Sequence, residues 1–189
     1  MIQSMILILG STLCIMLTIV SDTHSRDGHR LTSRTRVAVE SAALVAHAGD
    51  FVRNSVLREF EALAEKFIGV SGNNDDTEIC AQLPSKAQFE YAGVKFGMTH
   101  TCRGGPTAEA LFGRQQGVDV VITGHSHVPS IDSAGEITLI NPGSHAQPRG
   151  NRQAHVEIDN SSESDSLQCR LVTVDGDIFE RSVLTANKD

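Results

Sequence analysis

Short apolar runs that end in polar residues recur along the chain, and most have the length of a buried β-strand. The first covers residues 15–20 and is rich in branched side chains, a composition that favours a strand. Further strands are expected at residues 42–46, 67–70, 87–91, 94–98, 118–122, 137–140, 153–158, 167–174 and 178–184.

Helical patterns occupy several of the segments between these strands. Residues 53–65 carry apolar side chains at the spacing of an amphipathic helix: Val56, Leu57, Phe60, Leu63 and Ala64. Further helices are expected near residues 31–41 and 107–116. The latter is preceded by Pro106, a residue favoured at a helix entrance. The pattern predicts an α/β protein.

Composition limits the classes of function. The 189 residues include 40% hydrophobic side chains and carry a net charge of -7, so one globular domain is the default expectation. Only four lysines are present, which argues against a broad basic surface for nucleic acid and against a nuclease. The four cysteines show no Cys-x-x-Cys spacing and are interpreted as free thiols of a cytoplasmic protein.

The N-terminal residues 1–15 are unusually apolar. No Lys or Arg precedes Asp22, so the positive region of a signal peptide is missing. The run is also shorter than a comfortable membrane span, and its last residues are needed for the first strand. We therefore expect residues 1–15 to be an extension upstream of a functional start near Met16, residues 16–189 to form a single domain, and the protein not to be attached to a membrane.

Five expected strands end in side chains that can bind metal ions. Ligands in open α/β sheets gather beyond the carboxyl ends of the strands, and side chains two residues apart on an extended segment face the same side. The candidates, in chain order, are Asp22, His24, Asp50, Asn73, His100, His125 and His127. His47 is expected to be a hydrogen-bonded core residue instead, and His29 to be solvated.

The candidate set combines nitrogen and oxygen ligands without a thiolate. This mixture suits Mn, Fe, Zn or Ni and does not suit a calcium cage. Seven ligands exceed one tetrahedral set and fit two ions that share a carboxylate. Two metal ions about 3.5 Å apart would clamp a phosphate and lower the pKa of a bridging water. The alternative is that these are turn residues and solvated histidines.

The ordered motifs Asp-x-His, Gly-Asp, Gly-Asn-x-Asp, His and Gly-His-x-His resemble the calcineurin-like metallophosphoesterase superfamily, and within it the small YfcE-type phosphodiesterases. The segment Asn141-Pro-Gly-Ser144, followed by Pro148 and Arg149, also matches this branch. The resemblance runs from about Met16 to the C-terminus. It implies a four-layer αββα sandwich with two mixed β-sheets.

The resemblance also implies a function. Asp22, His24 and His127 would hold one metal ion, Asp50 would bridge, and Asn73, His100 and His125 would hold the other. A metal-bridging hydroxide would attack a small phosphate-ester substrate, a diester or a monoester. The two divalent ions are expected to be Mn, with Ni, Fe, Zn or Co as alternatives, and the family suggests a homodimer or homotetramer.

Two departures from the family pattern bear on catalysis. Many members have His after the metal-binding Asn as an acid for the leaving group, and this chain has Asn74 there. Thr101 and Cys102 replace the Gly and second His that often follow the His100 position. Asn74 and Arg149 are the candidate catalytic residues. Arg149, or alternatively Arg103, would neutralise the substrate phosphate.

A competing hypothesis is an interaction scaffold, because the retromer subunit of this family uses the fold as a binding platform. A scaffold has no physical need for a complete ligand set, and here all seven positions keep a side chain able to bind metal. The intact set therefore favours the enzyme.

Overall fold

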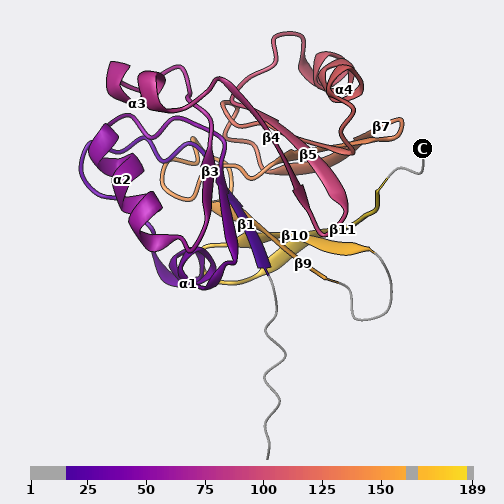
Figure 1. Ribbon diagram of the computed structural model, residues 1–189. Coiled ribbons are helices and arrows are strands. Elements are labelled where there is room, and N and C mark those ends of the chain that lie inside the picture. Colours follow the sequence, from indigo (N-terminus) through magenta and orange to yellow (C-terminus); the bar gives the residue numbers. More distant parts are fainter. Residues whose placement is uncertain (1–15, 161–165, 187–189) are drawn as a thin grey trace, which may run out of the picture.

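The computed structural model describes residues 16–160 and 166–186. The expected N-terminal extension at residues 1–15 lies outside these residues, as do residues 161–165 and 187–189. Two β-sheets and four α-helices make up the described chain (Figure 1). The helices are α1 (Ser33–Ser41), α2 (Asn54–Leu63), α3 (Thr77–Gln82) and α4 (Gly105–Gln116).

Both sheets are mixed. The six-stranded sheet has the order β11-β10-β9-β1-β2-β3 and is built from β1 (Met16–Val20), β2 (Leu44–His47), β3 (Phe67–Gly69), β9 (Ala154–Asn160), β10 (Leu167–Thr173) and β11 (Ile178–Leu184). The five-stranded sheet has the order β4-β5-β6-β8-β7 and is built from β4 (Lys86–Tyr91), β5 (Val94–Thr99), β6 (Val120–Ile122), β7 (Ser130–Ala134) and β8 (Ile137–Asn141).

Three apolar interfaces stack these elements into four layers. Alternate residues of β1 face opposite ways: Leu17 and Ile19 join the core between the sheets, whereas Met16 and Val20 join the core beneath α1 and α2. On the other sheet, Val121 packs in a separate cluster with Phe112 of α4. Figure 1 shows α1 and α2 beside the first sheet and α4 over the second. The expected αββα sandwich with two mixed sheets is confirmed.

Strand direction brings the polar strand ends together. β1, β2 and β3 are parallel neighbours in one sheet, and β5 and β6 are parallel neighbours in the other. Parallel strands present their carboxyl ends at one edge of the sheet. The five loops with candidate metal ligands follow these five strands.

Two elements were not expected from the sequence. Helix α3 is only six residues long, too short for a helical period to show, and Asp76 caps it by accepting a hydrogen bond from the Ile79 N–H at 3.0 Å. Strand β7 has the sequence Ser-Ile-Asp-Ser-Ala and lacks a strong apolar signature. None of the helices in the described ranges is long and apolar enough to cross a membrane.

Candidate metal centre

Asp22 and His24 emerge from the end of β1. Asp22 is fully buried, and its Oδ2 accepts hydrogen bonds from the Ser21 hydroxyl at 2.7 Å and the His125 N–H at 2.9 Å. Its Oδ1 has no hydrogen-bond partner among the described residues. That oxygen lies 3.2 Å from His127 Nε2 and 3.5 Å from His24 Nε2. One carboxylate oxygen thus remains for an ion between two imidazoles.

Asp50, after β2, stands between the two groups of histidines. Its Oδ2 lies 3.2 Å from His24 Nε2 and 3.3 Å from His100 Nε2. The loop after β3 approaches so closely that a Cβ at Gly72 would lie 2.2 Å from Asp50 Oδ1. Only glycine fits there, which explains on steric grounds why the Gly-Asn-x-Asp motif begins with Gly.

Asn73, His100 and His125 form the other side of the cluster. Asn73 Oδ1 lies 3.1 Å from His100 Nε2 and 2.8 Å from His125 Nδ1. All seven sequence candidates are therefore brought together at one edge. Two triads within the cluster have ligand atoms within 4.8 Å of one another: Asp22, His24 and His127, and Asp22, Asp50 and His100.

The outward nitrogens of two histidines determine which atom faces the cluster. His100 Nδ1–H donates to the Ala48 carbonyl at 2.7 Å, and His127 Nδ1–H donates to the Gln147 carbonyl. Since a carbonyl only accepts, a neutral ring then carries no hydrogen on Nε2. Both Nε2 lone pairs point at carboxylate oxygens. A neutral imidazole and a carboxylate are then both acceptors, so a metal cation or a proton on the imidazole must lie between them.

The charges of the cluster attract a cation. Burial lowers the pKa of His24, but the hydrogen bonds and charges of Asp22 and Asp50 outweigh it and raise this pKa to about 9. Burial opposes ionisation of Asp50 as well, yet His100 and His24 hold the pKa of Asp50 far below its usual range. Without a metal ion, a proton on imidazole supplies the positive charge that these carboxylates need.

The backbone of the site is held in an unusual conformation. Five of the seven candidates have positive φ: Asp22 at 54°, His24 at 43°, Asp50 at 62°, His125 at 67° and His127 at 58°. Non-glycine residues rarely adopt this region, and such strain gathers at functional sites. The strand-end motifs gave no signal of this.

Asp75 is a residue that sequence reasoning did not assign to the site, although it stands in the Gly-Asn-x-Asp motif. Its carboxylate accepts three backbone N–H groups: those of Asp50 at 3.2 Å, Val52 at 2.7 Å and Gly72 at 2.7 Å. Val52 is β-branched and has φ 88°, a costly conformation. Asp75 therefore ties the strained Asp50 loop to the loop after β3.

The two candidate catalytic residues occupy different positions. Asn74 donates its backbone N–H to Asp50 Oδ1 at 2.8 Å and its side-chain amide to Asp50 Oδ2 at 2.6 Å. Arg149 is exposed. Burial lowers the pKa of His127, and the positive charge of Arg149 lowers it further, which places the guanidinium within electrostatic reach of the cluster.

The remaining polar candidates lie outside the cluster. His47 is buried and is confirmed as a hydrogen-bonded core residue: its Nδ1 accepts the Gly49 N–H at 3.1 Å, so its Nε2–H donates to Thr23 Oγ1 at 2.9 Å. His29 is only half-buried, and its Nδ1 accepts the Leu31 N–H. Cys102 packs against the apolar cluster beneath α4, and Arg103 is exposed.

The fold and the site define a class of protein. The family model for the calcineurin-like phosphoesterase superfamily domain matches residues 15–161. The chain belongs to this superfamily.

Two curated relatives agree with this class. A probable metallophosphoesterase of Methanocaldococcus jannaschii is 32% identical over 173 residues, covering 89% of this chain and 85% of the relative. A phosphodiesterase of the same organism is 30% identical over 140 residues, covering 66% and 81%.

Solved structures show the same fold at lower identity. The phosphoesterase YfcE from E. coli superposes with a TM-score of 0.65 at 22% identity, covering 90% of this chain and 100% of that one. Vacuolar protein sorting 29 from Cryptosporidium parvum gives a TM-score of 0.74 at 16% identity, covering 91% and 98%.

Proposed function

We propose that this phosphoesterase hydrolyses phosphodiesters, and more slowly phosphomonoesters, with a pair of divalent metal ions. The observation that carries the proposal is the facing of imidazole nitrogens and carboxylate oxygens at 3.2 to 3.3 Å, with the other ring nitrogen of each histidine already hydrogen-bonded to a backbone carbonyl. Such a set of oriented nitrogen and oxygen ligands is suited to bind metal cations. The phosphodiesterase among the relatives supports the choice of diesters.

The seven ligands divide between two ions around Asp50. Asp22, His24 and His127 would hold one ion, and Asn73, His100 and His125 the other. Asp50 is suited to bridge because its Oδ2 lies at similar distances, 3.2 and 3.3 Å, from a histidine of each group. The mixed nitrogen and oxygen ligands suit Mn, with Ni, Fe, Zn or Co as alternatives.

Bound ions would lower the pKa of a water molecule and neutralise the phosphate. The oxygen of that water would form a bond to phosphorus as the bond to the leaving oxygen breaks, and the leaving alkoxide would take up a proton from solvent. Arg149 would pair with a phosphate oxygen. Asn74 would hold Asp50 in place and has no acidic proton to give, so alcohols that leave readily without protonation are favoured.

An interaction scaffold is the second candidate, supported by the similarity to vacuolar protein sorting 29. The complete ligand set favours the enzyme, and so does the strained backbone that Asp75 holds in place. A protein that only binds a partner needs neither feature. A nuclease is disfavoured by the acidic net charge of -7. A cytoplasmic location and a homodimer or homotetramer complete the proposal.

The function is tested on protein stripped with EDTA and reconstituted separately with Mn²⁺, Ni²⁺, Co²⁺ and Zn²⁺. Bis(4-nitrophenyl) phosphate and 4-nitrophenyl phosphate are compared as substrates. We expect faster release of nitrophenolate from the diester, and loss of this activity in Asp50→Asn. The matched control is Asp177→Asn, an exposed residue on the β10–β11 turn. Absence of turnover with all four ions would contradict the proposal.

A further inference from the structure

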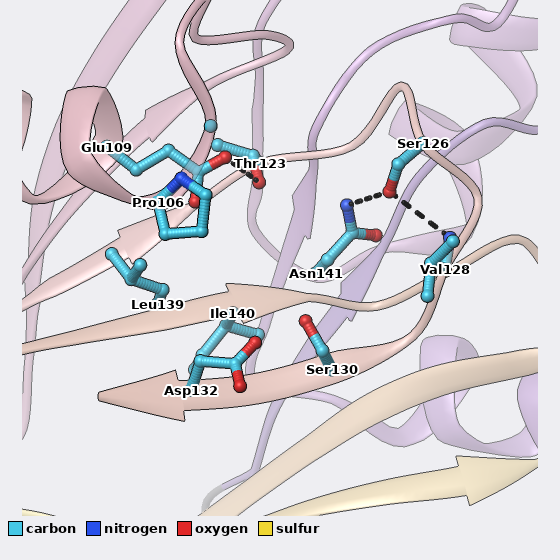
Figure 2. Close-up of a pocket in the computed structure, with 11 residues that line it drawn as sticks. Pro106, Glu109, Thr123, Ser126, Val128, Ser130, Asp132, Leu139, Ile140 and Asn141 are labelled. Atoms are coloured by element: carbon cyan, nitrogen blue, oxygen red, sulfur yellow. Dashed lines mark hydrogen bonds between the residues drawn. The ribbon is translucent and has the colours of Figure 1, made fainter. Parts of the chain in front are cut away.

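A cavity of about 260 Å³ lies directly beside the candidate metal centre. The first turn of α4, the end of β6, the loop that carries His125 and His127, and strands β7 and β8 form its walls. Figure 2 shows Glu109 and Thr123 on one side of this cavity, Ser126 and Asn141 on another, and Asp132 and Ser130 along β7.

The cavity and the metal centre share one loop. His125 and His127 point into the ligand cluster, while Ser126, the residue between them, lines the cavity. Asn141 fixes this wall by donating to the Gly124 carbonyl at 2.8 Å and to Ser126 Oγ at 3.0 Å. His125, Ser126 and Val128 are all exposed. An ester whose phosphate lies at the metal centre can therefore extend one arm across this exposed rim into the cavity.

The walls combine an apolar floor with negative charge. Leu139 is buried in the cluster beneath α4 and forms the floor. Glu109 and Asp132 supply carboxylates, and neither Lys nor Arg is among the lining residues.

Glu109 bears an electrostatic cost that a cation would remove. Its Oε1 accepts a hydrogen bond from Thr123 Oγ1 at 3.4 Å, and no ion pair forms at Glu109 or Asp132 within the described chain. Burial raises the pKa of Glu109, and the charge of Asp132 raises it further. A half-buried carboxylate without a cationic neighbour is complementary to a positively charged ligand.

We propose that this cavity binds the cationic arm of the phosphodiester substrate, an ammonium or trimethylammonium group on a two-carbon ester such as ethanolamine or choline. The inference rests on the proposed function and adds the substrate class. The volume of about 260 Å³ lies below the range of about 300 to 1,000 Å³ typical of drug-sized ligands. It suits a small headgroup, with the methylenes over Leu139 and the charge between Glu109 and Asp132.

The test uses two substrates that differ only in charge. In 4-nitrophenyl phosphorylcholine the arm is cationic, and in 4-nitrophenyl 3,3-dimethylbutyl phosphate a carbon atom replaces the nitrogen. Hydrolysis of each adds water to phosphorus and releases nitrophenolate. For the wild-type protein we expect kcat/KM to be about tenfold higher for the choline ester, a ratio that needs only modest charge attraction.

Two variants test whether Glu109 and Asp132 cause the preference for the cationic ester. Glu109→Gln removes the charge and keeps the shape of the side chain, and Glu109→Gln with Asp132→Asn removes both charges. We expect the substrate ratio to fall progressively toward one, with little change in kcat/KM for the neutral ester. The control Glu61→Gln removes an exposed charge on α2 and should keep the wild-type ratio. A substrate ratio that stays at the wild-type value in both the single and the double variant would overturn the inference, because a loss of folded protein lowers both activities equally and leaves the ratio unchanged.

Failure of this inference is distinguishable from failure of the proposed function. Equal turnover of both esters by the wild-type protein would overturn the cation site and leave the phosphodiesterase standing. If neither ester is hydrolysed with any of the four metal ions, the proposed function fails. The site is then decided by ¹⁵N chemical-shift titration with choline chloride. Shifts at Thr123 and Ser126 that disappear in Glu109→Gln would support it, and absence of shifts would overturn it.

Discussion

Two buried clusters in this protein combine histidine with carboxylate, and their hydrogen bonds differ. Between α1 and β9, Glu157 accepts two hydrogen bonds from Arg34, both at 2.6 Å, and one from His155 Nε2 at 3.0 Å. The other ring nitrogen of His155 pairs with Thr35 Oγ1 at 3.0 Å. At the metal centre, Asp22 Oδ1 instead has no hydrogen bond from the described residues.

Burial does not separate the two clusters, because Glu157 is 3% exposed and Asp22 is 0% exposed. The difference lies in whether positive charge is supplied internally. Arg34 provides a permanent positive charge to Glu157, whereas at the strand ends the carboxylates face imidazoles, whose protons a metal ion can displace. A self-neutralised cluster holds elements together, and a cluster with surplus acceptors is suited to binding cations.

The largest effect is expected when the ligand cluster at the metal centre loses the charge of Asp50. Asp50→Asn removes the carboxylate between the two groups of histidines while keeping its size. We expect kcat/KM for bis(4-nitrophenyl) phosphate to fall about a thousandfold, because a metal pair supplies several kcal/mol of transition-state stabilisation. Urea unfolding of the metal-free variant should also show a lower unfolding free energy, because His24 and His100 stabilise the ionised Asp50 carboxylate in the folded state. Unchanged activity in the metal-loaded variant, together with this loss of stability, would place Asp50 with the structural residues.

The next effect is the pH dependence of the unfolding free energy. It distinguishes a histidine that is buried neutral from a carboxylate that is buried charged. Burial lowers the pKa of His145 from 6.5 to about 4. The unfolded chain therefore binds its proton first as pH falls, and about 3 kcal/mol of unfolding free energy is lost between pH 6.5 and 4. His145→Gln should flatten this part of the profile relative to the wild type.

Glu157 acts in a lower window. Burial opposes its ionisation, but His155 and Arg34 lower its pKa from 4.5 to about 2. Its contribution is fully present above pH 4.5 and is lost as pH falls toward 2. Urea unfolding measured from pH 7 to 3 checks both windows. An unchanged slope between pH 6.5 and 4 in His145→Gln would contradict the assignment.

A smaller effect is expected when the cluster of Arg34, His155 and Glu157 loses the carboxylate charge of Glu157. Glu157→Gln should cost about 2 kcal/mol of unfolding free energy, less than the roughly 3 to 5 kcal/mol for a fully buried pair. Arg34 is 39% exposed and can be rehydrated. At saturating metal, kcat should not change. Glu40→Gln, in the exposed Arg36–Glu40 pair, is the matched control and should cost under about 0.5 kcal/mol. A fall in kcat without a loss of stability in Glu157→Gln would remove the contrast between the clusters.

The smallest expected effect concerns Asp75, whose carboxylate joins the Asp50 loop to Gly72 behind the metal centre. Asp75→Asn keeps one acceptor oxygen and loses the other, so we expect Mn²⁺ affinity to fall about tenfold, as for other groups that orient metal ligands. Asp76→Ala is the neighbouring control: it removes the cap of α3 and should cost about 1 kcal/mol of stability without changing Mn²⁺ affinity. Equal Mn²⁺ affinity in both variants would show that Asp75 does not position Asp50.

The strand ends of the site could be predicted from the sequence because each polar tip directly follows a strong apolar run. His24 and His127 lie 3.1 Å apart at Nε2, although 103 residues separate them and they follow strands of different sheets. Their proximity therefore depends on how the two sheets stack. The boundaries of the expected helices and strands differ from the observed ones by no more than two residues. Helix α3 and strand β7 were missed because neither has a distinct hydrophobic period.

Other features depend on tertiary contacts that no local pattern encodes. The pairing of Arg34 with Glu157 joins residues 123 positions apart, and neither carries a motif. The left-handed backbone of Asp50 depends on Asp75, 25 positions away. The cavity beside Ser126 forms only when α4, β7 and β8 meet, so its carboxylates could not be grouped from the sequence.

The central claim is that surplus acceptors at the strand ends hold two divalent cations. Elemental analysis of protein reconstituted with Mn²⁺ and then desalted tests it most directly. The account predicts two Mn²⁺ per chain in the wild type and fewer in Asp50→Asn, with Glu157→Gln retaining both. A wild-type protein that keeps no stoichiometric transition-metal ion after reconstitution would contradict it.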